Sequence, residues 1–151
     1  MRAMTMVAGL ALALTACGGK GGEDQKPAEA APAGQTPAAT GAVHEVAMDF
    51  DGKKGTFSPT ELTIKAGDAV RFVVKSGPPH NVAFSADSIP AGGATVLTAA
   101  MTETMAPLAG PMKIGIGEAY EISFAGAPAG TYKYHCTPHV PFGMHATIVV
   151  Q

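Results

Sequence analysis

Eleven residues near the C-terminus, Tyr134–Met144 ("YHCTPHVPFGM"), carry three side chains that can bind a metal. They are the thiol of Cys136, the imidazole of His139 and the thioether of Met144. Thiolate and thioether sulfurs are soft donors, which favour copper, zinc or iron–sulfur clusters over calcium and magnesium. The spacing therefore predicts a soft transition-metal site on a loop that contains two prolines and a glycine.

Strand periodicity predicts where these side chains point, because alternate residues of a strand face the same side of a sheet. Cys136 has the parity of the two preceding tyrosines, and Met144 has that of the last apolar residues of the chain. Both sulfurs should therefore face the interior at one end of a sheet, with His139 on the loop between them. The candidate for a fourth ligand is His80 in "SGPPHNVAF", directly before an apolar alternation.

One thiolate, two imidazoles and one thioether form the ligand set of a blue-copper electron-transfer site. Zinc is an alternative, but a thioether is a poor ligand for it. A Cys–His nucleophile pair is another alternative, although no segment indicates an oxyanion hole or a substrate pocket. We do not expect an enzyme, because four protein ligands leave no open position for a substrate.

The elements that must position these residues begin at about Ala42, where short alternating apolar runs are separated by turn residues. This pattern predicts an all-β domain, a β-sandwich of seven to eight strands. The segment 85–117 has few strand signals, so we expect a long crossover with a short helix around Thr98–Met105. Parity points His135 and His145 outward, where we expect exposed side chains, and His44 has no predicted role.

Three methionines of the crossover allow two interpretations. Met101 and Met105 would share a face if that stretch is helical, and with Met112 they could load Cu(I). Methionine is also a common filler under long loops.

The N-terminus has the features of an export signal. Residues 1–16 contain Arg2 and then an apolar run too short to span a bilayer comfortably. "LTAC" at Leu14–Cys17 resembles the lipobox of bacterial lipoproteins, which implies cleavage before Cys17 and lipid on its sulfur; an ordinary secretory signal is the alternative. We expect residues 17–41 to comprise the anchor cysteine and a disordered Ala/Pro/Gly linker. A lipidated Cys17 would leave Cys136 without a disulfide partner.

Two segments, "PHNVAF…IPAG" and "GTYKYHCTPHVPFGM", resemble the copper-binding segments of the cupredoxin family, which includes plastocyanins and pseudoazurins. "FSPTELTIKAGDAVRFV" resembles the early strands of that family, and the resemblance covers about residues 43–151, most weakly over 91–115. It implies a Greek-key β-sandwich in which His80, Cys136, His139 and Met144 bind one copper that cycles between Cu(I) and Cu(II). It also implies that Asn81 ties the two ligand loops together.

The predicted organisation is a lipoprotein signal peptide (1–16), an anchor and linker (17–41) and a cupredoxin domain (42–151). We expect a monomeric one-electron carrier, lipid-anchored on the periplasmic or another extracytoplasmic face of a bacterial membrane. Redox proteins should dock transiently at an apolar patch from which the ring of His139 emerges. The net charge of −2 gives no basic field for nucleic acid. The alternatives are a copper-delivery lipoprotein and a metal-free structural one.

The resemblance fails at one informative position. His135 precedes the cysteine, where plastocyanins of photosynthetic cells have a tyrosine. The resemblance therefore implies electron transfer without implying a photosynthetic partner.

Overall fold

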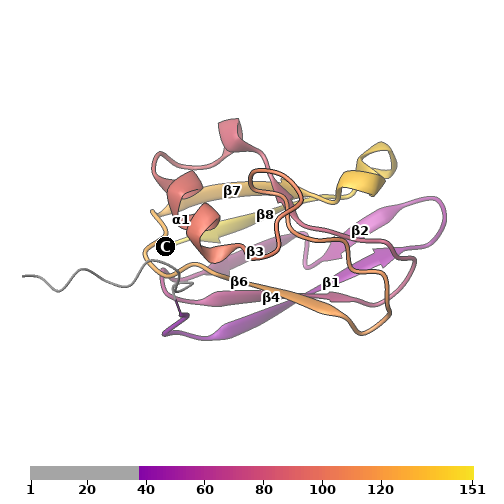
Figure 1. Cartoon of the computed structure of the whole chain (residues 1–151), viewed down its shortest axis with the longest axis horizontal. Helices are drawn as coiled ribbons and strands as arrows, with labels where there is room; N and C mark the ends of the chain where they lie inside the picture. The colour runs from indigo at the N-terminus through magenta and orange to yellow at the C-terminus, as the bar shows by residue number, and fades with distance from the viewer. Residues whose placement is uncertain (1–37) are drawn as a thin grey trace, which may run out of the picture. The chain divides into compact units, whose positions relative to one another are not determined.

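A computed structural model describes residues 38–151, and the predicted signal peptide and most of the linker lie outside this part. Two four-stranded sheets pack face to face (Figure 1). One sheet has the order β2 (Gly55–Ser58), β1 (Val43–Phe50), β4 (Ala69–Val74) and β6 (Ala119–Ser123). The other has the order β3 (Glu61–Ile64), β8 (His145–Val150), β7 (Gly130–His135) and β5 (Ala83–Phe84). The prediction of an all-β Greek-key β-sandwich of seven to eight strands is confirmed.

The chain changes sheet at each of the five connections from β2 to β7, whereas β1–β2 and β7–β8 each stay within one sheet. β1 is parallel to β4 and β3 is parallel to β8, whereas the other neighbouring strands are antiparallel. The sequence analysis did not identify β2, because its four residues are too few to show a clear alternation. Among the described residues, no helix is long and apolar enough to cross a membrane.

An aromatic cluster fills the space between the sheets. The ring of Tyr134 on β7 lies with its centroid 4.7 Å from Phe57, 5.4 Å from Phe72 and 5.7 Å from Phe84. Tilted and edge-on aromatic pairs of this kind add to the stabilisation from apolar burial. They come from both sheets, so they fix how one sheet lies on the other and thereby position the ends of β7 and β8.

The segment 85–117 is the crossover that the sequence predicted, with a short 3₁₀ helix η1 (Ala86–Ser88) and one α-helix, α1 (Gly93–Ala100). The predicted short helix exists but lies earlier than Thr98–Met105, because α1 follows the left-handed Gly92 and the chain is non-helical at Glu103, with φ of 52°. Met101 directly follows the helix in an extended conformation and is buried, whereas Met105 is 59% exposed. The two methionines therefore do not share a helix face, and the copper-loading interpretation loses its geometric basis.

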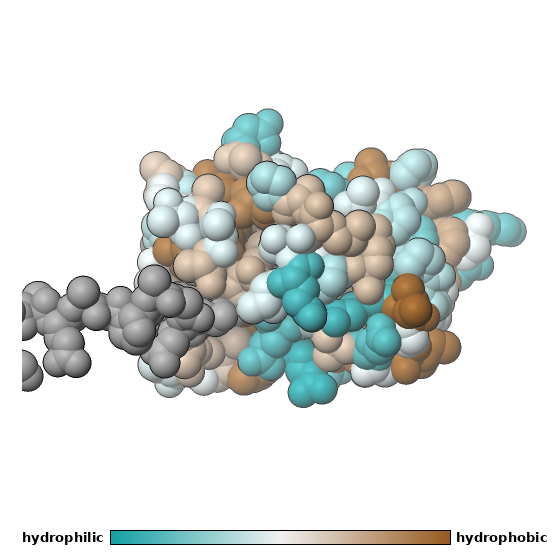
Figure 2. Space-filling view, viewed as in Figure 1, coloured by the Kyte–Doolittle hydropathy of each residue, from teal (hydrophilic) through white to brown (hydrophobic). Residues whose placement is uncertain are grey.

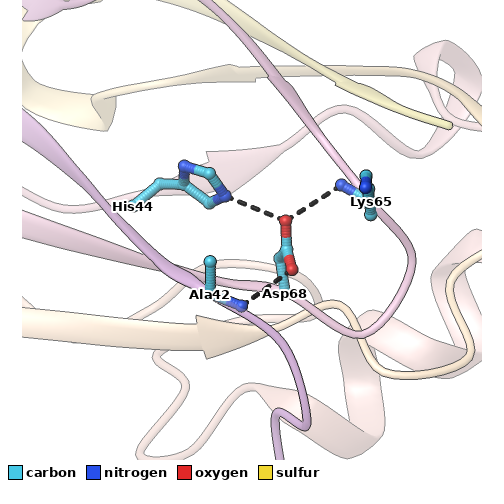
Figure 3. Close-up of polar contacts among 4 residues, drawn as sticks. All are labelled: Ala42, His44, Lys65 and Asp68. Atoms are coloured by element: carbon cyan, nitrogen blue, oxygen red, sulfur yellow. Dashed lines mark hydrogen bonds and ion pairs between the residues drawn. The ribbon is translucent and has the colours of Figure 1, made fainter.

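The start of β1 is fastened by Asp68 in the turn between β3 and β4 (Figure 3). Its carboxylate accepts hydrogen bonds from the backbone N–H of Ala42 at 2.9 Å and of Lys65 at 3.0 Å, and lies 2.9 Å from Nε2 of His44. The bond from Lys65, followed by the contact with His44, holds the pKa of Asp68 below its usual value. This cluster holds the N-terminal end of β1, and Phe50 lies at the C-terminal end of the same strand.

Candidate metal centre

Three of the predicted ligands converge at the end of the sandwich where β7 meets β8. Sγ of Cys136 lies 3.6 Å from Nδ1 of His80 and 3.4 Å from Nδ1 of His139. The ligand atoms of all three residues lie within 4.8 Å of one another. His80 and Cys136 are fully buried and His139 is 5% exposed, so the group is removed from bulk water.

The spacing of these atoms fits a bound transition metal. Bonds of about 2.0 Å to nitrogen and 2.3 Å to sulfur are typical of late first-row metals. At angles of about 110–120° such bonds place sulfur and nitrogen about 3.5–3.7 Å apart, close to the distances of Cys136 from the two imidazoles. One sulfur and two imidazole nitrogens are a donor set that suits copper.

A hydrogen bond orients the ring of His80. Its Nε2 lies 2.7 Å from the carbonyl oxygen of Ser76, which can only accept, so Nε2 carries the proton. Nδ1 is therefore the unprotonated nitrogen, and it faces Cys136. The backbone of His80 also exchanges hydrogen bonds of 3.0 and 2.8 Å with Lys113 in the crossover. This residue is thus held through both its ring and its main chain.

Asn81 joins the segment that carries His80 to the loop after Cys136. Its Oδ1 accepts a hydrogen bond of 2.8 Å from the backbone N–H of Thr137, and its Nδ2 donates to Oγ1 of Thr137 at 3.1 Å. Its own backbone N–H points at Sγ of Cys136 at 3.5 Å. Contacts of this kind orient metal ligands and tune the metal, because they fix the position and charge of the sulfur.

The loop between β7 and β8 is a 3₁₀ helix, η2 (Thr137–Phe142), closed by Gly143 in the left-handed conformation. The N–H of Cys136 donates to the carbonyl of Met144 at 3.1 Å, and the N–H of Met144 donates to that of His139 at 3.2 Å. Met144 is fully buried beside the cluster. A Cβ added at Gly55 would lie 2.6 Å from Cβ of Met144 and 3.1 Å from Cβ of His139, so β2 packs its bare backbone against this loop.

The surface above the cluster differs from the expectation that the ring of His139 emerges. Phe50 at the end of β1 stacks on this ring with a centroid distance of 4.2 Å and an interplanar angle of 25°. Phe142 packs on both rings, with its own ring centroid 4.9 Å from that of Phe50 and 6.1 Å from that of His139. The sequence analysis did not name Phe50 as a site residue, because it ends one of the alternating apolar runs, which indicate only core positions.

Burial also sets the protonation of the group. It raises the pKa of the Cys136 thiol, although hydrogen bonds from the backbone of Asn81 and His139 act in the opposite direction. Burial, and secondarily the proximity of His80, lowers the pKa of His139. The imidazole of His139 is therefore a neutral ligand at pH 7. A metal must displace the proton of the Cys136 thiol as it binds.

The sequence matches a known family over most of its length. Residues 44–151 match the family of copper binding proteins described as the plastocyanin/azurin family. The chain belongs to this family. The identification agrees with the cupredoxin resemblance found in the sequence. Together, the family match and the sulfur–imidazole cluster show that the protein binds one copper.

Individual members of this family support the assignment. The chain is 37% identical to the plastocyanin of Scenedesmus fuscus over 106 residues, an alignment that covers 70% of this chain and 97% of that protein. It is 34% identical over 117 residues to the plastocyanin of Nostoc punctiforme, covering 77% and 79%. The solved structure of the oxidized plastocyanin from Dryopteris crassirhizoma matches with a TM-score of 0.56 at 28% identity, covering 71% of this chain and 99% of that one.

The remaining candidates of the sequence analysis do not contact the cluster. His135 and His145 point outward from the sheet, but only His145 is exposed as expected, whereas His135 is half-buried beside Ser85 and Lys133. His44 lies with Asp68 at the other end of β1. Cys17 is outside the described residues. Cys136 is a free cysteine, and its burial argues against a nucleophile, which needs access to a substrate.

Proposed function

We propose that this cupredoxin carries one electron at a time on a copper that Cys136, His80 and His139 would hold, with the thioether of Met144 as a weak fourth ligand. The observation that supports the proposal is the buried group of one sulfur and two imidazole nitrogens with metal-compatible spacing. Copper supplies the redox chemistry by cycling between Cu(I) and Cu(II). The protein supplies a fixed donor set with no open position for a substrate, so we do not propose an enzyme.

The way the ligands are held favours electron transfer over metal delivery. His80 is fixed by Ser76 and by the backbone of Lys113, and the sulfur of Cys136 accepts the N–H of Asn81. Ligands held in this way move little when copper changes its oxidation state. Buried ligands also release the metal slowly, which suits a resident cofactor better than cargo.

An apolar surface surrounds the metal end and is the docking site that we propose for redox proteins. Val140 and Phe142 on η2 are each 40% exposed, and Ile114 and Ile116 in the crossover are 72% and 73% exposed. The pairing of His80 with Lys113 places Ile114 beside the ligand segment. Figure 2 shows strongly hydrophobic side chains at the right-hand end of the domain, the end that carries η2 and the loop before β6 in Figure 1. A small apolar surface supports brief docking of a monomeric carrier.

The proposed location is the extracytoplasmic face of a bacterial membrane, most specifically the periplasm. The export signal in residues 1–16 and the lipobox ending at Cys17 support it, and Cys17 would carry the lipid anchor. Residues 17–41 would then tether the copper domain and let it reach partners along the membrane surface.

The proposal is tested by the spectrum and electrochemistry of the purified protein with Cu(II). A Cu–thiolate bond gives an intense visible charge-transfer band, and a carrier shows a reversible one-electron wave. Replacing Cys136→Ser should abolish the band and lower both copper content and stability, because copper bound only by the folded state stabilises it. His44→Gln is the matched control and should keep the band. A colourless, redox-silent copper adduct would refute electron transfer and favour copper delivery.

A further inference from the structure

Two histidines that take no part in the copper centre stand opposite each other on the outer face of the sandwich. His135 ends β7 and His145 begins β8, and the two are direct partners in the antiparallel register. Their neighbours Cys136 and Met144 are fully buried, so the two imidazoles point to the other side of the sheet. The pairing of β7 with β8 thus brings two metal-binding side chains together, whereas strand parity alone predicted only that each would be exposed.

The hydrogen-bond pattern makes this pair a close one. The N–H of Cys136 donates to the carbonyl of Met144, which makes Cys136 and Met144 a hydrogen-bonded pair. His135 and His145 are therefore a non-hydrogen-bonded pair, in which side chains approach each other most closely. Two like residues at such a position repel each other when both are protonated, so sheet stability gives no reason for the pairing.

The ring geometry is near that of a chelate. The centroids of His135 and His145 are 6.1 Å apart with an interplanar angle of 49°. The rings of His80 and His139 in the copper centre are 4.7 Å apart at 52°. Two imidazoles that share one metal with bonds of about 2.0 Å have centroids about 4.5–5 Å apart. Small side-chain rotations close the difference, and within residues 38–151 no hydrogen bond holds either outer ring in place.

The surroundings can complete a coordination shell. The pair lines a pocket of about 360 Å³ together with the hydroxyl-bearing residues Ser85, Ser88 and Thr147. Hydroxyls and water can fill the positions that two imidazoles leave open. Lys133 also lines this pocket, and its positive charge opposes a cation and limits the affinity.

We propose that His135 and His145 form a second metal site, which binds a divalent late first-row transition metal in exchange with the solvent. Imidazole suits Zn(II), Cu(II) and Ni(II), and Cu(II) binds most tightly among them. Because the site is open and has two protein ligands, it binds and releases metal faster than the buried centre. The site is separate from the copper centre and does not depend on the electron-carrier proposal.

The site is tested by titrating the full-length copper-loaded protein with Zn(II) in a calorimeter while the visible spectrum is recorded. We expect one equivalent of Zn(II) to bind without loss of the buried copper. His135→Gln and His145→Gln should each weaken binding by about tenfold or more, because one of two chelating bonds is lost. His44→Gln is the matched control and should bind normally, and Lys133→Gln should bind more tightly because a like charge is removed.

Three results would overturn the site. They are the absence of a saturable equivalent of Zn(II), unchanged binding in the double variant of His135 and His145, and displacement of copper by Zn(II) during the titration. Failure of the electron-carrier proposal would instead appear as a redox-silent protein that still binds Zn(II) through the outer pair. The same variants remain folded if their buried copper and thermal midpoint are unchanged, so loss of binding cannot be attributed to unfolding.

Discussion

The hydroxyl of Tyr134 provides a sharp test of the core. Tyr134 is 1% exposed, and its oxygen has no hydrogen-bond partner among the described residues. Burying a polar group without a partner costs about 1–3 kcal/mol. Tyr134→Phe removes that oxygen and keeps the ring contacts with Phe57 and Phe72. We therefore expect the free energy of unfolding to rise by about 1–2 kcal/mol.

Tyr132, two residues earlier on the same face of β7, is the matched control. It is fully buried, but its hydroxyl donates a hydrogen bond of 2.8 Å to the carbonyl of Pro128. Tyr132→Phe should lower the free energy of unfolding by about 0.5–1.5 kcal/mol, because a made hydrogen bond is lost. The two variants therefore have effects of opposite sign, although the chemical change is identical.

Urea unfolding of the copper-free protein measures both effects without the contribution of the metal. With a urea m-value of about 1–3 kcal/mol/M, a difference of about 2 kcal/mol between the variants separates their midpoints by roughly 1 M, which is well resolved. An equal loss of stability in both variants would refute the reasoning, because it would mean that the hydroxyl of Tyr134 is hydrogen-bonded in the folded protein.

Three further substitutions test the site and the fold. Gly55→Ala places a methyl group 2.6 Å from Cβ of Met144, so this residue must move and the visible band and reduction potential of the copper protein should shift; an unchanged spectrum would contradict the close packing. Asn81→Ala removes both hydrogen bonds to Thr137 and should weaken copper binding about 10–100-fold in a chelator competition, whereas equal affinity would show that the tie is dispensable. Asp68 has a lowered pKa in the folded state, so its stabilisation is present above about pH 4 and disappears as the pH falls through the folded pKa. Thermal midpoints should show that Asp68→Asn lowers stability at neutral pH and flattens this acid dependence, and parallel curves for both proteins would refute it.

Much of the fold and the central features of the site could be predicted from the sequence. The alternation along β1, β4, β7 and β8 is a local property, since every second residue of a strand points the same way whatever lies opposite. It correctly places Cys136 and Met144 in the interior and turns His135 and His145 to the outer face, although His135 is half-buried there. The helix was misplaced because its beginning depends on a left-handed glycine and its end on one non-helical residue, neither of which periodicity reveals.

By itself, the sequence determined the kinds of ligand, their spacing and their direction, because these follow from residue type and strand parity over a few positions. Only the tertiary structure decided which distant residues meet. Phe50 covers His139 and the backbone of Gly55 presses on Met144 because the aromatic core sets how one sheet lies on the other. His135 faces His145 because the register of β7 on β8 brings them together, and register is a property of the paired strands that neither strand specifies alone.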